Sequence, residues 1–275
     1  VSLARNIGYV PRSRRAARAT VNFSASGITT DTKQITFQPG VIANGSVSNI
    51  NYVFSLPEAV SFNAFNGASQ GRLVIYQGQY VTNSYVVDNN NPSERYVLPN
   101  DGIDTSTISV KIRNSASDNT TTSYELVDNI IGITSTSNIY LLQETTDEKY
   151  ELLFGDNVFG KKLESGNIIE ISYIKTNGKE GNGIENFTFA GLINDEDGAE
   201  ETDFRVFFTS NEKSANGDEI EPVESVKYYA PRLYAAQHRA VTANDYEAII
   251  PSIYPNIESV SAYGGEDLDP PQFGR

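Results

Sequence analysis

Residue types that often carry chemistry are absent from this 275-residue sequence or nearly so. It contains no cysteine, methionine or tryptophan, and its single histidine is His238. Without cysteine the chain has no disulfide bonds, thiolate metal ligands or thiol nucleophiles. A zinc site or a Ser-His-Asp triad would have to be built around His238 alone. We therefore predict a protein that is not an enzyme, with no catalytic residue, metal site or cofactor.

Other patterns of known sites are incomplete. Residues 155–157 and 195–198 each resemble part of a calcium-binding loop, but neither completes the EF-hand pattern. Residues 178–183 are glycine-rich but lack the GK[ST] of a phosphate-binding loop, so we predict a tight turn that needs positive φ. No apolar run approaches the roughly 18 residues of a membrane span, and we predict no membrane contact.

Charge is unevenly spread along the chain. The net charge is −14, but residues 1–30 hold five arginines and no acidic residue, which leaves −19 on the rest. The acidic body argues against nucleic-acid binding, and the arginines of the basic arm have no aromatic residues among them, which argues against it there too. We expect the basic arm to be extended and to pair with acidic surface on its own or a neighbouring chain. Its candidate interaction residues are Arg12, Arg14, Arg15 and Arg18.

Most segments have the composition of β-strands, because β-branched and aromatic residues alternate with polar ones between Gly, Asn, Asp and Pro turns. In residues 167–174, Ile169, Ile171 and Tyr173 share one face. The expected strands include residues 19–25, 33–38, 72–81, 106–113, 138–143 and 167–174. We predict a mainly β, elongated, multi-domain chain with an α+β C-terminal piece.

The C-terminal piece begins with two expected helices. The first follows Pro222, which suits a first helical turn, and Pro231 should interrupt or bend it. Val223, Val226 and Ala230 fall on one face of this helix.

The second expected helix begins at a capping-box variant formed by Thr242 and Asp245. Pro251 should end or kink it after about two turns. Arg239 is placed to pair with Asp245, and His238 lies at the junction of the two helices, where we interpret it as structural. Residues 257–263 alternate again and predict a strand.

These patterns suggest four parts. Residues 1–17 form a helix end and the basic arm, and residues 216–275 form a truncated α+β piece. Residues 18–80 with 180–215 form a discontinuous β-rich domain, into which residues 81–179 are inserted as a second β domain. Because the sequence starts at Val1 and stops in a loop-like run, we expect a piece of a longer chain.

Three stretches together resemble the baseplate J-like family, and within it the wedge subunits of contractile-tailed bacteriophages. In the second stretch, Gly155, Asp156, Gly160 and Gly166 match the family's F-G-D…G-K…G spacing. In the third, "RAVTANDYE" matches a unit that recurs in the family. The stretches are residues 95–113, 150–183 and 223–267.

The resemblance implies a structural role in the virion tail baseplate, with assembly in the host cytoplasm. Such wedge proteins pair as homodimers and link neighbouring wedges into an inner ring around the hub. The implied partners are therefore a second copy and other wedge and hub proteins. Besides the arginines, the candidate interaction residues lie on the first C-terminal helix and are Val223, Val226, Tyr229, Leu233 and Tyr234.

Two other functions remain open from the residues alone. A receptor- or carbohydrate-binding β module would stack sugar rings on the many tyrosines. A polysaccharide-degrading enzyme would need a carboxylate pair, and among 35 acidic residues the sequence marks none.

Overall fold

The computed structural model describes the chain except for residues 1–3, 5–8, 92, 128–131, 146–148, 211, 238, 255–256, 258, 266–267, 269 and 273–275. These residues form two compact units. Residues 13–220 make up the β unit, and residues 1–12 with 221–275 make up the helical unit.

The described part of the β unit consists of strands and one short 3-10 helix, η1 (Gly178–Gly181). The strands are β1 (Arg18–Ser26), β2 (Gln34–Phe37), β3 (Gly40–Val47), β4 (Ile50–Leu56), β5 (Val60–Asn63), β6 (Ala68–Gln77), β7 (Gln79–Val86), β8 (Tyr96–Val97), β9 (Ile103–Arg113), β10 (Thr121–Leu126), β11 (Ile139–Glu144), β12 (Tyr150–Phe154), β13 (Ile168–Lys175), β14 (Phe187–Phe189), β15 (Ile193–Asn194) and β16 (Arg205–Thr209). The mainly β prediction is confirmed, and the six predicted strand regions of the β unit all contain strands.

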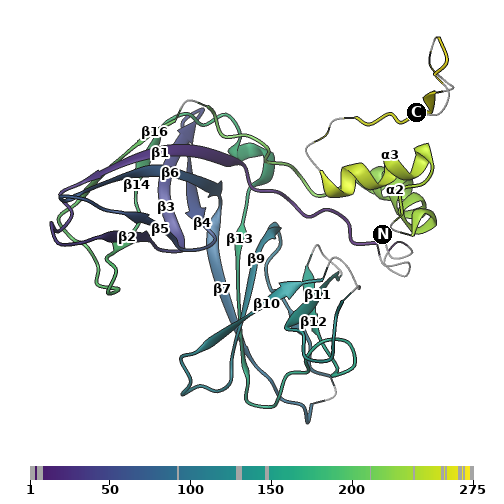
Figure 1. The fold of residues 1–275 in the computed structure, drawn as a ribbon, viewed down its shortest axis with the longest axis horizontal. Helices are drawn as coiled ribbons and strands as arrows, with labels where there is room; N and C mark the ends of the chain where they lie inside the picture. The colour runs from purple at the N-terminus through teal and green to yellow at the C-terminus, as the bar shows by residue number, and fades with distance from the viewer. Residues whose placement is uncertain are drawn as a thin grey trace. The chain divides into compact units, whose positions relative to one another are not determined.

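The first core lies between two antiparallel sheets. One has the order β14-β3-β4-β6-β1-β16 and the other the order β15-β2-β5. β1, β6 and β16 lie side by side (Figure 1), and the end strands β14 and β16 approach each other, so that the larger sheet nearly closes. Strict alternation along β1 turns Ala19, Val21 and Phe23 inward. At the centre, the Phe37 ring packs edge-on against Phe23 at 4.8 Å between ring centroids.

The second core belongs to a seven-stranded sheet with the order β7-β13-β9-β10-β11-β12-β8. All its neighbours are antiparallel except β10 and β11, which are parallel. The face predicted for β13 is confirmed, because Ile169, Ile171 and Tyr173 are fully buried while Glu170 and Ser172 are partly exposed.

One predicted strand, residues 72–81, is two strands in different sheets. β6 ends at Gln77 and β7 begins at Gln79, with Gly78 between them at φ +136°. A β-carbon on Gly78 would collide with the carbonyl of Lys175, so only glycine allows the chain to change sheets there.

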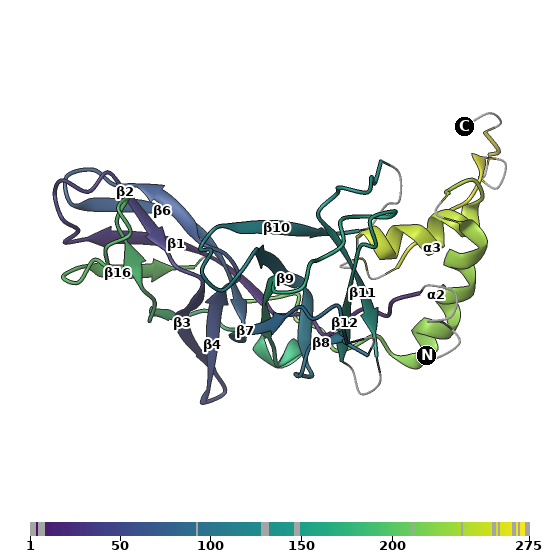
Figure 2. The same cartoon turned by 90° about the horizontal axis from the view of Figure 1, so that it is seen from below.

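The helical unit contains α2 (Val223–Ala236) and α3 (Ala243–Ile253), which lie against each other (Figure 2). Both predicted helices are confirmed, but their prolines do not end them. Pro231 and Pro251 lie inside the helices, and Pro222 occupies the cap position of α2 rather than its first turn. α2 ends at Gln237, which adopts the left-handed conformation with φ +46°.

The prediction of a strand at residues 257–263 is wrong. Its described residues form no strand, because alternation gives a strand only where another strand supplies hydrogen bonds. Instead, the Ala262 N–H donates to the Glu247 carboxylate. His238 lies outside the described residues, and the four-part division of the chain stays a prediction.

Candidate assembly surfaces

From Ser13 onward, the basic arm is part of the β unit rather than a free extension. The backbones of Arg15 and Asp218 exchange hydrogen bonds of 2.9 and 3.2 Å, and those of Arg18 and Ala215 exchange bonds of 2.7 and 2.9 Å. This segment therefore pairs like a strand with residues 215–218, which fixes the direction of its side chains.

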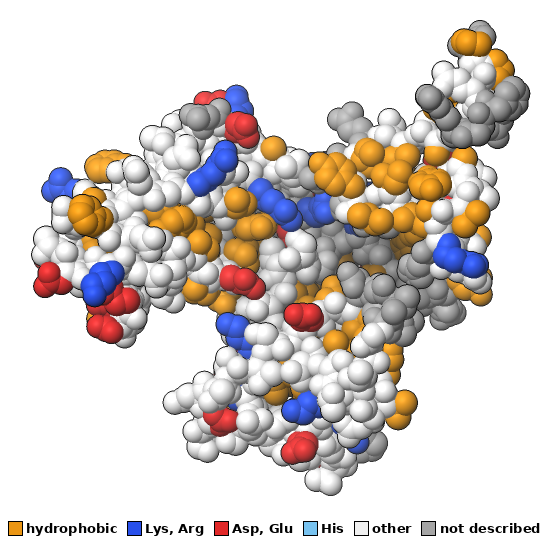
Figure 3. Space-filling model, viewed as in Figure 1, with side chains coloured by type: hydrophobic (Ala, Val, Ile, Leu, Met, Phe, Trp, Pro, Cys, Tyr) orange, Lys and Arg blue, Asp and Glu red, His pale blue; other side chains and the backbone are white. Residues whose placement is uncertain are grey.

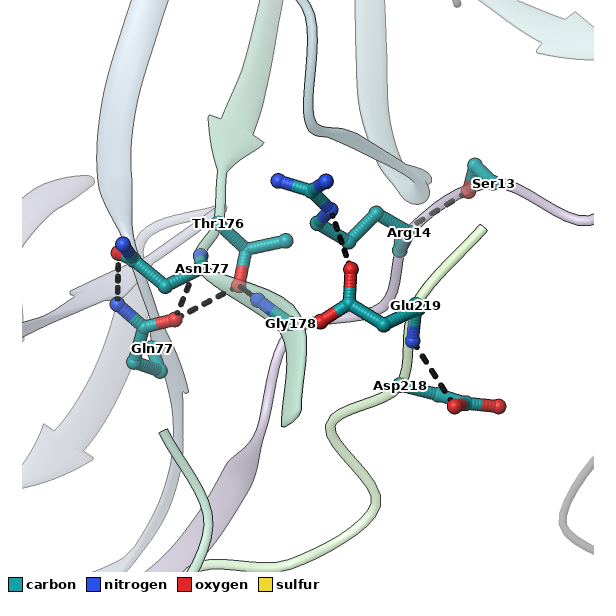
Figure 4. A network of polar contacts seen from close by, with 8 residues as sticks. All are labelled: Ser13, Arg14, Gln77, Thr176, Asn177, Gly178, Asp218 and Glu219. Carbon is teal, nitrogen blue, oxygen red and sulfur yellow. Dashed lines mark hydrogen bonds and ion pairs between the residues drawn. The ribbon is translucent and has the colours of Figure 1, made fainter. Parts of the chain in front are cut away.

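Two arginines of the arm have partners on their own chain. The Arg14 Nε lies 3.2 Å from Glu219 Oε2, an ion pair without the alignment of a hydrogen bond (Figure 4). The Arg18 guanidinium lies 5.0 Å from the centre of the Tyr76 ring and donates to Ser106 Oγ at 3.2 Å. We expected the arm to pair with acidic surface on its own chain or on a neighbouring one. For Arg14 the acidic partner is on its own chain.

A buried carboxylate joins the arm to the seven-stranded sheet. Asp104 is fully buried at the start of β9 and accepts a hydrogen bond of 2.9 Å from the Ala16 N–H. It also accepts from the N–H and hydroxyl of Ser106 at 3.0 and 2.6 Å. Sequence reasoning missed this residue, although an aspartate at the start of a strongly β-branched strand was a usable signal.

Gln77 ties together the segment that enters the seven-stranded sheet, at the end of β6, and the segment that leaves it, at the end of β13. Its Oε1 accepts from Thr176 Oγ1 at 2.7 Å and from the Asn177 N–H at 3.0 Å. Its Nε2 donates to Asn177 Oδ1 at 2.9 Å (Figure 4). The chain then turns at Gly178, with φ +66°, so the predicted positive-φ turn is confirmed. These bonds hold the end of β6 beside the end of β13.

In the helical unit, Glu221 holds the N-terminal segment to the start of α2. Its carboxylate accepts from the Tyr9 hydroxyl at 2.8 Å and from the Arg12 N–H at 3.0 Å, and the Ser225 hydroxyl also donates to it. Burial, and then the charge of Glu221, raise the pKa of Tyr9 above its ordinary value. Tyr9 therefore stays a neutral donor to this carboxylate.

The predicted interaction residues on α2 divide into buried and exposed ones. Val226 is 2% exposed and packs against Ala4 and Tyr9. It is therefore a core residue of the unit, and a part for it in an interface stays a prediction. Tyr229 and Leu233 are partly buried. Val223 and Tyr234 are 49% and 63% exposed.

The helical unit exposes an unusual number of large apolar side chains, and we call this set the apolar surface. Apolar side chains gather over α3 on the face seen in Figure 3. The Arg232 guanidinium stacks on Tyr228 at 3.6 Å, so part of the surface is an ordered cation-π pair. Exposed apolar patches of this kind mark contact sites for other proteins. The set, 46–77% exposed, is Val223, Tyr228, Tyr234, Val241, Tyr246, Ile253, Tyr254 and Tyr263.

A groove of about 780 Å³ lies against the seven-stranded sheet of the β unit. Its lining includes Tyr80, Lys111 and Glu125 together with loop residues near Pro39 and Pro57. Tyr124 and Tyr140 also border it, but both are buried in the second core and cannot offer a ring face for stacking.

The two incomplete calcium loops, residues 155–157 and 195–198, lie within the described residues. Across the described ranges, no three His, Cys, Asp or Glu side chains are placed to hold a metal ion. Asp156 caps its own turn by accepting from the N–H groups of Val158 and Phe159 at 2.9 and 2.8 Å. The Phe159 and then the Val158 bond lower the pKa of this carboxyl. No described helix is both long and apolar enough to cross a membrane.

Comparison with known proteins points to one class, the baseplate wedge proteins. Residues 242–275, which begin at the capping box of α3, match a family described as "Baseplate structural protein gp6, C-terminal domain I". The whole chain is similar to "Baseplate wedge protein gp6" of Enterobacteria phage T4, with 23% identity over 284 residues. The alignment covers 94% of this chain and 40% of that relative. Both matches support the wedge resemblance of the motifs, whereas membership of the baseplate J-like family stays a prediction.

Proposed function

We propose that this chain is a non-catalytic structural component of a contractile phage-tail baseplate. In this role it is a wedge subunit that pairs with a second copy and links neighbouring wedges into an inner ring around the hub. Its other partners are wedge and hub proteins of the virion, and it assembles with them in the host cytoplasm. The observation that carries the proposal is the apolar surface of the helical unit.

Half of that surface lies in the part of the chain that matches a baseplate family. Tyr246, Ile253, Tyr254 and Tyr263 all fall within residues 242–275. Removing a side chain of this size from water contributes about 1.5–3 kcal/mol. A few such anchors suffice to hold a protein interface, because a small number of buried apolar residues dominates the binding energy.

Self-association provides the test. We expect sedimentation velocity over a wide concentration range to show a reversible dimer. The double variant Tyr234→Gln/Ile253→Gln should weaken the dimer by about thirtyfold or more, since even one interface anchor contributes about 2 kcal/mol. The matched control is Phe65→Gln/Val158→Gln, which removes two similarly exposed apolar side chains from the β unit, 78% and 81% exposed. The control should leave the dimer unchanged.

Two outcomes would count against the proposal. A chain that remains monomeric throughout the range removes the physical support for pairing. Equal loss of association in both double variants would mean that general stickiness, rather than the helical unit, drives it.

The carbohydrate-binding alternative has a weaker basis. Of the three tyrosines at the groove, only Tyr80 is partly exposed, while Tyr124 and Tyr140 belong to the core. Saturable glycan binding that is lost on Tyr80→Ala would favour this alternative.

A further inference from the structure

We propose that strand β7 is a second self-pairing site, at which two copies of the chain join their seven-stranded sheets edge to edge. The inference rests on the proposed assembly role, but it concerns the β unit rather than the apolar surface. It starts from the position of β7 at the end of its sheet, where β13 is its one ladder neighbour among the described strands, although β3 and β4 of the six-stranded sheet also come close to β7.

β7 lacks the features that natural edge strands use to prevent pairing. Such strands are short, carry charges or proline, or contain bulges. β7 has eight residues, QYVTNSYV, without charge, proline or glycine. Its register with β13 is continuous from Gln79 opposite Lys175 to Val86 opposite Ile168.

The other terminal strands of the described sheets are protected by length or charge. β8 and β15 have two residues each, β14 three and β5 four. β16 has five and begins with Arg205. Only β7 among them combines length with lack of charge.

The direction of the free backbone groups follows from the antiparallel ladder. The Val87 N–H donates to the Asn167 carbonyl, so odd-numbered residues of β7 bond to β13. Backbone groups of the even-numbered residues therefore point to the open edge. These residues are Tyr80, Thr82, Ser84 and Val86.

One antiparallel register pairs all four of these residues with a second copy. It places Tyr80 opposite the partner's Val86 and Thr82 opposite the partner's Ser84, with a two-fold axis at Asn83. Each such pair exchanges two hydrogen bonds, which gives about eight across the joint. Shifting the register by two residues leaves one of the four residues of each copy unpaired.

The side chains fit this register. Aromatic with β-branched and Thr with Ser are favourable cross-strand pairs, and they occur here as Tyr80 with Val86 and Thr82 with Ser84. On the inner face, Val81 would meet Tyr85. Each copy carries a net charge of −14, so an uncharged strand lets two acidic bodies approach without like charges directly opposite each other.

The absence of cysteine makes a cross-linking test specific. Variants Thr82→Cys and Ser84→Cys change exposed residues of β7. Across the proposed joint their Cα atoms would be about 5.5 Å apart, within disulfide range. Two Thr82→Cys chains would be about 9 Å apart, which is too far.

Mixing the two variants under mild oxidation should therefore give mixed disulfide dimers about tenfold faster than either variant alone. One variant carries a size tag to distinguish the products. Adding Val86→Lys to both should slow the reaction to the rate of collisions, because an edge lysine opposes pairing. The matched control is Val74→Lys, an exposed valine on β6 of the other sheet, 44% exposed against 64% for Val86.

Equal rates for the mixed and single variants, or cross-linking that survives Val86→Lys, would overturn the proposal. The Tyr234→Gln/Ile253→Gln background separates it from the proposed function. Cross-linking that persists there while sedimentation shows weaker association supports β7 on its own. Dimers in sedimentation without register-specific cross-linking would refute β7 pairing and leave the apolar surface intact.

Discussion

The two units of this chain use large apolar side chains in opposite ways. In the β unit they fill two cores, and all the largest fully buried side chains lie there, including Phe37, Phe54 and Tyr173. In the described part of the helical unit, the buried apolar residues are small, namely Ala4, Val226, Ala230, Ala236 and Ala248. Several of its tyrosines and Ile253 are exposed instead, whereas Tyr9, Ile249 and Ile250 are partly buried.

This difference separates a scaffold from a contact element. Burial stabilises a fold roughly in proportion to apolar area, so alanines and one valine contribute little to the helical unit. Small units with little buried area are marginal without additional contacts. We therefore infer that the helical unit gains stability from a partner, whereas the β unit is stable by itself.

The largest expected effect comes from a cavity in the first core. Phe37→Ala should destabilise the β unit by about 3–5 kcal/mol, since this ring is fully buried among other phenylalanines. Urea unfolding followed by circular dichroism measures the change. Tyr234→Ala, in the helical unit, should change the unfolding free energy by less than about 0.5 kcal/mol. A similar decrease of the unfolding free energy in both variants would contradict the difference in apolar packing between the units.

The next effect concerns the arm, which belongs to the β unit. Asp104→Ala leaves the Ala16 N–H and the Ser106 groups without a buried acceptor and should cost about 2–3 kcal/mol. Asp104→Asn keeps an acceptor and should recover part of the loss. Asp203→Ala, a change at an exposed aspartate, serves as the control in the same urea experiment. A neutral Asp104→Ala would mean that the arm is not held as the structure shows.

Local patterns account for most of the fold that the sequence predicted. Alternation identified β1 and β13, and the Thr242/Asp245 spacing identified the start of α3. The failures are non-local. Nothing in residues 72–81 shows that Gly78 separates two sheets, because neither its positive φ nor its closeness to the Lys175 carbonyl can be read from the sequence.

The candidate surfaces were predictable in part for a related reason. An exposed apolar residue and a buried one look alike in a sequence. The same reasoning therefore proposed both Tyr234, which is exposed, and Val226, which is buried. Helical spacing gives the face of a residue but not which face meets the rest of the unit. Likewise, positive charge marked Arg14 but could not name Glu219, two hundred residues away, as its partner.

A smaller effect is expected at the capping box of α3. Thr242 Oγ1 accepts from the Asp245 N–H at 3.3 Å, and the Asp245 carboxylate accepts from the Thr242 N–H at 2.8 Å. Thr242→Ala should destabilise α3 by about 1 kcal/mol, and Thr242→Ser should restore most of it. Amide hydrogen exchange in α3 measures the loss, and exchange in β13 should not change. An increase of the exchange rate in β13 as large as that in α3 would contradict a loss confined to α3.

The smallest effect is a pH dependence confined to the helical unit. Hydrogen bonds from Thr242, backbone first, lower the pKa of Asp245 below its ordinary value of 3.8. A carboxyl with a lowered folded pKa stabilises α3 above the unfolded value and loses that contribution as pH falls through the folded pKa. We therefore expect amide exchange in α3 to accelerate on acidification below that value, relative to Asp245→Asn, whose side chain does not titrate. Because Asp245 is exposed, the difference should be slight and partly screened by salt. Identical acid profiles for the two chains would show that the carboxylate adds nothing beyond an acceptor, and that packing alone, sparse as it is in this unit, holds the helix.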